Sequence, residues 1–173
     1  MVNILQTQDL SSFGDFGRIM DKIGNQWMLL TAGTMQQANT MTVSWGSVGV
    51  LWHRPMVNIV VRPERYTYEF VEREEYFTLS FFGEEYREAL NFCGVKSGRD
   101  VDKFTHCGLT LGAHESGGLL IKEATENFIC KKRYRTPITF EQMERDFDPT
   151  SYYNEKKGGL HIMYMAEIID RVM

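Results

Sequence analysis

Two stretches of the sequence carry side chains that could hold a charged, planar ligand. Residues 39–45 alternate between apolar and hydroxyl-bearing side chains, which is typical of a strand with one apolar and one polar face. Residues 62–67 follow a second expected strand and contain a proline directly after Arg62. Arg62, Arg65 and Thr67 supply two guanidiniums and a hydroxyl at the point where a helix is expected to begin. A polar strand edge beside a cationic helix start favours a planar, polar-edged ligand that carries a phosphate.

A second basic cluster lies at residues 96–104. Gly98 would let the backbone approach a ligand closely, and Arg99 and Lys103 can pair with phosphate oxygens. Taken alone, each cluster is better explained as a solvated loop with internal Arg–Asp pairs. Because two such clusters occur in one domain, a phosphate site and solvated loops become about equally favoured. The sequence contains neither a P-loop nor a G-x-G-x-x-G turn after a strand, so a phosphate compound would bind in another way.

Composition narrows the class of protein. The chain has 173 residues, 43% of them hydrophobic, and a net charge of −4, which predicts one soluble globular domain rather than a nucleic-acid-binding one. The basic run at residues 131–135 is interpreted as the exposed face of a strand with Tyr134 turned inward. A nucleic-acid-binding β-barrel is an alternative that the aromatic strands favour and the net charge opposes. No apolar run approaches the ~18 residues of a membrane span.

Cysteine and histidine spacing predicts neither a metal site nor side-chain catalysis. Three cysteines without a C-x-x-C pair argue against a zinc site or a disulfide framework, and favour reduced thiols in a cytoplasmic setting. The N-terminus has no basic region followed by an apolar core, so no secretory signal is expected. The four histidines show no H-x-x-x-H spacing, and no G-x-S-x-G elbow is present. Any chemistry would therefore come from a bound cofactor.

Short β runs dominate the chain, and few helices interrupt them. Strands are expected at residues 26–31, 40–47, 56–62, 76–82, 109–111, 119–121, 127–134 and 161–169. Helices are expected at residues 67–75, where Thr67 is a candidate N-cap, and at 84–93, before Gly94. The predicted fold class is mainly β (α+β), a barrel or sandwich with a few flanking helices. Residues 1–18 are interpreted as a polar N-terminal arm and residues 19–173 as a single domain.

Five motifs, in their order and spacing, resemble one known family. They lie at residues 31–33, 39–46, 61–68, 77–82 and 97–104, in a matching region that spans most of the chain. The chain resembles the flavin reductase-like, FMN-binding split-barrel proteins, and among them the flavoredoxin branch. The resemblance implies a homodimer of split β-barrels with flavin mononucleotide (FMN) in a cleft near the subunit interface. It also implies that N5 of the flavin carries the chemistry, so no catalytic side chain is expected.

The resemblance further implies where FMN would lie. Residues 39–45 would follow the isoalloxazine and ribityl chain, residues 80–82 would line the pocket, and side chains of residues 62–67 would reach the phosphate, as would Lys103. The implied cofactor-binding residues are Asn39, Thr40, Met41, Thr42, Val43, Ser44, Trp45, Arg62, Tyr66, Thr67, Ser80, Phe81, Phe82, Arg99 and Lys103. Cationic groups near N1 and O2 of the flavin would raise its reduction potential. Without the resemblance, Trp45 would be interpreted as an ordinary core tryptophan.

One departure from the family pattern bears on the electron donor. Family members that take hydride from a nicotinamide often have Gly-Asp-His before the last long strand, and residues 159–161 here are Gly-Leu-His. The missing aspartate favours an electron carrier, while His161 is a candidate nicotinamide-side residue. The sequence therefore predicts an FMN-dependent redox protein that accepts hydride from NAD(P)H or shuttles electrons to a partner protein. The alternative is a small-ligand-binding split barrel without flavin redox activity, which the intact Arg62, Thr67 and Lys103 oppose.

Overall fold

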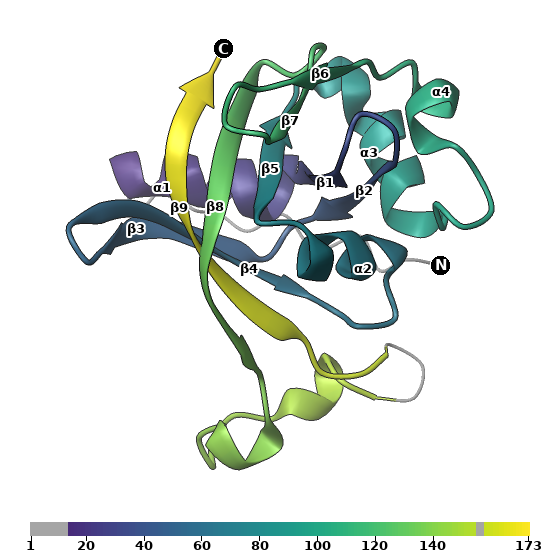
Figure 1. Cartoon of the computed structure of the whole chain (residues 1–173). Coiled ribbons are helices and arrows are strands. Elements are labelled where there is room, and N and C mark those ends of the chain that lie inside the picture. The colour runs from purple at the N-terminus through teal and green to yellow at the C-terminus, as the bar shows by residue number, and fades with distance from the viewer. Residues whose placement is uncertain (1–13, 155–157) are drawn as a thin grey trace.

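The computed structural model describes residues 14–154 and 158–173, and strands dominate it (Figure 1). The predicted mainly β fold with a few flanking helices is confirmed. The strands are β1 Met28–Gly33, β2 Ala38–Val43, β3 Gly46–Leu51, β4 Arg54–Val61, β5 Tyr76–Phe81, β6 Leu111–Ala113, β7 Leu119–Ile121, β8 Glu126–Pro137 and β9 Ile162–Val172. The helices are α1 Asp15–Asp21, α2 Tyr66–Arg73, α3 Arg87–Val95 and α4 Lys103–Cys107, with short π or 3₁₀ turns at η2 Lys22–Gln26, η3 Glu84–Tyr86, η4 Phe140–Gln142 and η5 Pro149–Ser151.

One antiparallel sheet coils until its two edges approach each other. Its strand order is β2-β1-β5-β8-β9-β4-β3, which puts β2 and β3 at opposite edges. Only Ser44 and Trp45 separate the end of β2 from the start of β3. Three trans peptide units span at most about 11 Å, so the two edges must come this close at that point. We call this junction of β2 and β3 the seam.

The two faces of β1 pack into two different cores. Leu30 is fully buried in the larger core, inside the coiled sheet, together with Ile59 and Tyr164. Its neighbour Leu29 points the other way, into a smaller core with Leu90 of α3. This alternation follows from the period of two along a strand. Each such leucine stabilises the fold by about 1.5–3 kcal/mol through the apolar area that it buries.

Two irregularities in β8 bend the sheet. The pairing of β8 with β9 shifts between Ile129 and Cys130, and again between Lys132 and Tyr134. A bulge adds a residue to one strand and re-aims the side chains beyond it. The expectation that Tyr134 turns inward is therefore wrong, because the bulge reverses the alternation and leaves Tyr134 51% exposed. The Lys132 side chain bends back instead and donates to the carbonyl of Glu72 at 3.0 Å.

Several predicted boundaries are corrected by the structure. The expected strand 40–47 is two strands, because the chain changes sheet edge at the seam. Helix α2 begins one residue before the expected N-cap, so Thr67 is a buried helical residue and Arg65 takes the cap position. Residues 1–13 of the expected arm lie outside the described residues, and Asp15–Asp21 form a helix. Helix α4 was not expected; the Asp102 carboxylate caps it by accepting from the amide of Phe104 at 3.0 Å.

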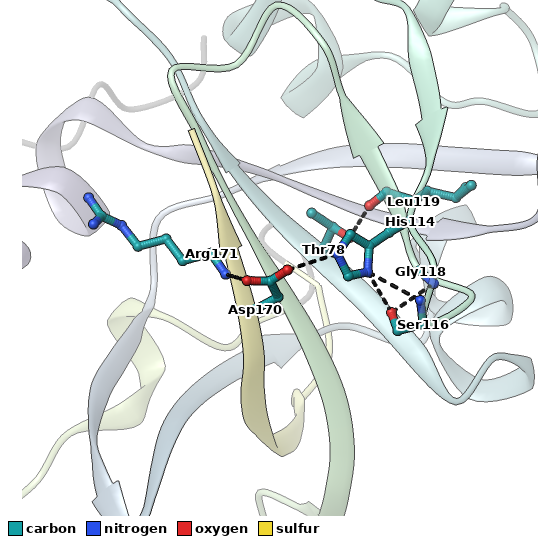
Figure 2. Close-up of polar contacts among 7 residues, drawn as sticks. All are labelled: Thr78, His114, Ser116, Gly118, Leu119, Asp170 and Arg171. Carbon is teal, nitrogen blue, oxygen red and sulfur yellow. Dashed lines mark hydrogen bonds and ion pairs between the residues drawn. The ribbon is translucent and has the colours of Figure 1, made fainter.

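A Ser–His–Asp chain joins the β6–β7 turn to the end of β9 (Figure 2). His114 Nε2 lies 2.9 Å from Asp170 Oδ2, and His114 Nδ1 lies 2.9 Å from Ser116 Oγ. The neighbouring amides are already committed, since Gly117 donates to the His114 carbonyl and Gly118 donates to Ser116 Oγ. The amides of Ser116, Gly117 and Gly118 are therefore not free to stabilise an oxyanion. The chain of contacts therefore holds the turn against β9 rather than forming a catalytic triad.

None of the helices in the described part of the chain has the length and apolar character needed to span a membrane.

Candidate functional site

The first cavity of the candidate site opens at the seam, where β2 ends. It has a volume of about 190 Å³. We call it the seam cavity, and its lining residues are Met41, Thr42, Val43, Ser44, Trp45, Val60, Arg62, Arg65 and His161. The lining comes from the end of β2, the end of β4 with the turn after it, and the residue before β9. These elements meet only because the sheet coils, so the cavity is a consequence of the strand order.

A second cavity, of about 90 Å³, adjoins the first at the start of α2. We call it the helix cavity, and its lining residues are Asn39, Met41, Glu64, Arg65, Tyr66, Thr67, Val95, Lys96, Ser97, Gly98 and Lys103. Met41 and Arg65 line both cavities. The backbone amides of Tyr66 and Thr67, the first two residues of α2, have no partners within the helix, and their partial positive charge favours an anion. A ligand with an anionic end could therefore occupy the two cavities together.

The wall between β2 and α2 is held by a buried polar contact. Asn39 Nδ2 donates to Thr67 Oγ1 at 2.9 Å, and both residues are buried. Gly98 lies directly against this pair, since a Cβ added there would stand 2.0 Å from Asn39 Oδ1. The loop between α3 and α4 can approach β2 this closely only with glycine at the position. The hydroxyl hydrogen of Thr67 stays available to a ligand, because its oxygen is the acceptor in the contact.

Lys103 brings a buried ammonium to the helix cavity. The residue is 4% exposed, and Nζ donates to the carbonyls of Thr40 at 2.7 Å and Cys93 at 2.8 Å. An ammonium has three donors, so one remains for a ligand. Burial lowers the pKa of Lys103 from its ordinary value. An anion in the cavity would offset that desolvation and favour the charged form.

The two arginines after β4 are oriented by backbone carbonyls. Arg65 Nη1 donates to the carbonyl of Gly94 at 3.0 Å, and Arg62 Nη2 donates to the carbonyl of Tyr152 at 3.1 Å. The Nε of Arg62 is buried and finds no hydrogen-bond partner among the residues that the structure describes. Buried donors are rarely left without a partner. This orphaned donor beside the seam cavity fits a bound group that accepts a hydrogen bond.

His161 also lines the seam cavity, and its ring is neutral at neutral pH. Its ring centroid lies 5.3 Å from that of Trp45, and its Nδ1 lies 3.2 Å from the hydroxyl oxygen of Tyr153. Burial, reinforced by the charges of Arg62 and Arg65, lowers the pKa of His161 to about 4. Burial also raises the pKa of Tyr153, so its hydroxyl keeps its proton. The pair offers a ligand hydrogen bonds without a formal charge.

Some of the expected ligand residues lie away from both cavities. The hydroxyl of Thr40 is buried against the Leu30 carbonyl at 3.2 Å, and Ser80 Oγ donates to Asn127 at 2.7 Å. Phe81 packs in the larger core, and Phe82 lines a separate cavity beside α3. Arg99 forms an ion pair with Glu69 and lines a neighbouring cavity of about 310 Å³ instead. The remaining expected residues line the seam cavity or the helix cavity.

The structure adds residues that the resemblance did not supply. Arg65 was visible in the basic cluster at 62–67, but its position between the two cavities depends on the turn after β4. Glu64 Oε1 accepts from the amide of Gly159 at 2.7 Å, which brings a carboxylate to the segment before His161. The charge of Glu64 raises the pKa of His161 and so opposes the two arginines. No pattern in the sequence signals this contact, because it joins segments far apart in the chain.

The described residues contain no group of three or more His, Cys, Asp or Glu side chains that could hold a metal ion. The donors at the two cavities are instead amides, hydroxyls and cations. Such donors suit an anionic organic ligand better than a metal.

Comparisons with known proteins identify the family. No curated protein matches the chain. A flavoredoxin from Methanosarcina acetivorans superposes with a TM-score of 0.65 and 24% identity, over 85% of this chain and 67% of its own. An FMN-binding protein from Thermus thermophilus, solved with p-hydroxybenzaldehyde, gives a TM-score of 0.64 and 16% identity over 84% and 70% of the two chains. An NADH:FAD oxidoreductase from Streptomyces globisporus, solved with NAD and FAD fragments, gives 0.60 and 17% over 85% and 74%.

At these identities the solved structures show the fold, which is the split barrel of flavin reductase-like proteins. The family model described as flavin reductase like domain matches residues 20–171, which is most of the sequence. The chain therefore belongs to the flavin reductase-like domain family.

Proposed function

We propose that this protein binds FMN and works as a redox protein through it. The observation that carries the proposal is the pair of joined cavities, one with a cationic helix start and one at the seam, with the orphaned Nε of Arg62 beside them. When bound, FMN would supply hydride or electron transfer at N5. The protein's own residues bind it, orient it and set the charge around it.

The helix cavity suits the phosphate of FMN. The first turn of α2 directs backbone donors there, Thr67 has a free hydroxyl hydrogen, and Lys103 keeps one unused donor. Arg65 adds a guanidinium at the boundary between the two cavities. Hydrogen bonds from charged donors contribute about 1.5–3 kcal/mol each, so two cations account for much of the affinity for a phosphate. The same cluster would discriminate FMN from riboflavin, which lacks the phosphate.

The seam cavity suits the isoalloxazine. Residues 41–45 run along one wall as the end of a strand and its exit, where backbone donors and acceptors can meet the polar edge of a ring. Trp45 offers an aromatic surface, and neutral His161 faces it. Arg62 and Arg65 place positive charge at this cavity, which favours the anionic reduced form of the flavin and raises its potential.

Two roles in electron transfer fit this site: a reductase that takes hydride from NAD(P)H, and an electron carrier that works with a partner protein. The residue at position 160 bears on the choice between them. Leu160 stands where family members that use a nicotinamide often have aspartate, and this favours an electron carrier that works with a partner protein. The carboxylate of Glu64, from the turn after β4, accepts from the Gly159 amide and so lies against this segment, which supports direct acceptance of hydride from NAD(P)H. An anaerobic titration with NADH distinguishes the two. Prompt bleaching of the flavin band identifies a reductase, whereas bleaching by dithionite alone identifies a carrier.

We also propose that the protein is a homodimer. The β3–β4 hairpin projects from the sheet edge, and all of β3 is exposed (Figure 1). Val50 is 79% exposed and Trp52 is 56% exposed, which are high values for large apolar side chains. An unpaired edge strand with apolar residues favours association with a second copy. Analytical ultracentrifugation tests this, and a Val50→Asp, Trp52→Asp double variant should sediment as a monomer if the hairpin forms the interface.

The binding proposal is tested by titrating FMN and riboflavin into the purified protein. Lys103→Met and Arg65→Ala should each weaken FMN binding about tenfold or more, and should leave riboflavin binding within about threefold. Arg133→Ala is the matched control, because Arg133 pairs with Glu167 on β9 and touches neither cavity. Equal losses of FMN and riboflavin would contradict the assignment of the phosphate to the helix cavity. A wild-type protein that binds neither would overturn the flavin function.

A further inference from the structure

Two of the three cysteines face each other between α3 and α4. Cys93 lies on α3 and Cys107 on α4, and their Sγ atoms are 3.9 Å apart. Cys93 is fully buried, whereas Cys107 is partly exposed to solvent. The third cysteine, Cys130, is buried in β8. Two sulfurs at van der Waals contact, one of them accessible, are an arrangement that oxidation can join.

We propose that Cys93 and Cys107 form a reversible disulfide that locks α3 to α4 and so controls the helix cavity. A disulfide bond is about 2.05 Å long, so the two sulfurs must approach by roughly 1.9 Å. Helix α4 is a short helix that ends at Gly108, which has a φ of +64°, and Cys107 is its last residue. Cys107 packs at the edge of the smaller core, whereas Cys93 is fully buried inside it, so we expect Cys107 to make most of the approach.

The chemistry requires a two-electron oxidant, for which a peroxide suffices. The Cys107 thiolate attacks one oxygen of hydrogen peroxide, which breaks the O–O bond and gives a sulfenic acid and, after protonation, water. The Cys93 thiolate then attacks the sulfenic sulfur, forms the S–S bond and releases hydroxide, which takes up a proton as a second water. Two thiols and one peroxide thus give one disulfide and two waters. A dithiol reductant restores both thiols by exchange.

The surroundings of the two thiols set the rate at which they are oxidised. Burial raises the pKa of Cys93 to about 12 and also raises the pKa of Cys107. The Lys103 ammonium opposes this effect at both thiols, since it favours their thiolates. The thiolate is the reactive form, so oxidation should be slow near neutral pH and should accelerate as the pH rises. Cys107 reacts first because it is the more exposed of the two.

The disulfide would act on the phosphate-binding groups through the backbone of Cys93. Its carbonyl accepts from Lys103 Nζ at 2.8 Å, and the next carbonyl, of Gly94, accepts from Arg65 at 3.0 Å. Lys103 is the first residue of α4, so the shift that brings Cys107 to Cys93 would move Lys103 relative to the two α3 carbonyls that orient it and Arg65. We expect the oxidised protein to bind FMN several-fold more weakly than the reduced protein. This consequence rests on the proposed FMN function, whereas formation of the disulfide does not.

The test uses the purified full-length chain, treated with equimolar hydrogen peroxide and then analysed by thiol titration under denaturing conditions. The wild-type protein has three thiols and should lose two of them, with a Cys93–Cys107 crosslinked peptide in the digest. Cys130→Ala should lose both of its remaining thiols, and Cys107→Ser should lose neither. Dithiothreitol should restore every lost thiol. Retention of all three wild-type thiols, or a crosslink that involves Cys130, would overturn the disulfide.

The coupling to the helix cavity is measured separately, as the FMN dissociation constant of reduced and oxidised protein. We expect a several-fold increase on oxidation of the wild-type protein and of Cys130→Ala, and no change for Cys107→Ser. Identical constants for reduced and fully crosslinked wild-type protein would contradict the coupling. If the reduced protein binds no FMN, the proposed function fails, and the thiol titration still decides whether the disulfide forms.

Discussion

The side-chain amide of Asn39 donates a 2.9 Å hydrogen bond to the hydroxyl of Thr67, although 28 positions separate the two residues in the sequence. Asn39 is 4% exposed and Thr67 is 1% exposed, so water cannot replace either partner. This contact joins β2, which lines the seam cavity, to the first turn of α2, which lines the helix cavity. It therefore fixes the distance and angle between the two parts of the candidate site.

Substitution of Gly98 tests the close approach of the α3–α4 loop to this contact. In Gly98→Ala the new Cβ would meet Asn39 Oδ1 at 2.0 Å, so the amide must rotate and lose its bond to Thr67. We expect the free energy of unfolding to fall by about 2 kcal/mol, which combines overpacking with a broken buried hydrogen bond. Urea denaturation measures it. Gly49→Ala is the control, because nothing lies within 4 Å of a Cβ at that position, and a loss of the same size there would refute the explanation.

Removal of the buried ammonium should destabilise the fold even without a ligand. In Lys103→Met the carbonyls of Thr40 and Cys93 lose their donor, while the apolar stem is kept. Each unsatisfied buried acceptor costs about 1–3 kcal/mol, so we expect a loss of about 2 kcal/mol or more in the free energy of unfolding. Lys122→Met, at an exposed position, should change it by less than about 0.5 kcal/mol. Equal stabilities of the two variants would show that water solvates the two carbonyls.

The sequence was informative where a local pattern decides the structure and silent where distant contacts decide it. The short apolar run at residues 119–121 and the proline after Arg62 placed β7 and the exit from β4 close to their observed positions. The motifs also identified the family, which the comparison confirms. The division of the strand at Ser44 could not be predicted, because both halves have strand character and only the coiling of the sheet separates them. The same holds for Tyr134, whose orientation depends on a bulge in the pairing.

The residues of the candidate site also differ in whether a local pattern in the sequence or only a distant contact reveals them. Residues 39–45 and 62–67 were recognisable because their polar side chains interrupt apolar strands, and the structure brings these two segments together. Tyr153 and Glu64 were not recognisable, since each reaches His161 or its segment only through the path of the chain between β8 and β9. Ser80 and Phe81 were proposed on the resemblance alone. Their alternation along β5 did not reveal that both faces of this strand are buried.

Charge substitutions next to His161 should shift its pKa in opposite directions. Burial is the largest cause of its low pKa, the Arg62 guanidinium lowers it further, and the Glu64 carboxylate raises it. Arg62→Gln should therefore raise the pKa of His161, and Glu64→Gln should lower it. Titration of the histidine ring signals by NMR gives the pKa in each variant. A shift in the same direction for both substitutions would mean that the two side chains act by rearranging the segment rather than by their charges.

The neutral state of His161 should make the stability of the protein depend on pH. Its pKa is about 4 in the folded protein, against an ordinary value of 6.5, so the unfolded chain binds a proton more readily between these values. A base with a lowered folded pKa contributes stability that is fully present above the unfolded pKa and is lost as the pH falls toward the folded one. Between pH 7.5 and pH 5 the wild-type protein should lose about 2 kcal/mol from this residue.

His161→Gln isolates this effect, because glutamine keeps a hydrogen-bonding side chain and does not titrate. Urea denaturation of both proteins at the two pH values gives four free energies of unfolding. The decrease from pH 7.5 to pH 5 should be smaller in His161→Gln by about 2 kcal/mol, whatever the other groups contribute to both proteins. An equal decrease in the two proteins would mean that His161 takes up its proton near pH 6.5 in the folded state. Its ring would then carry charge beside Arg62, and the seam cavity would have to be solvated rather than closed around a neutral histidine.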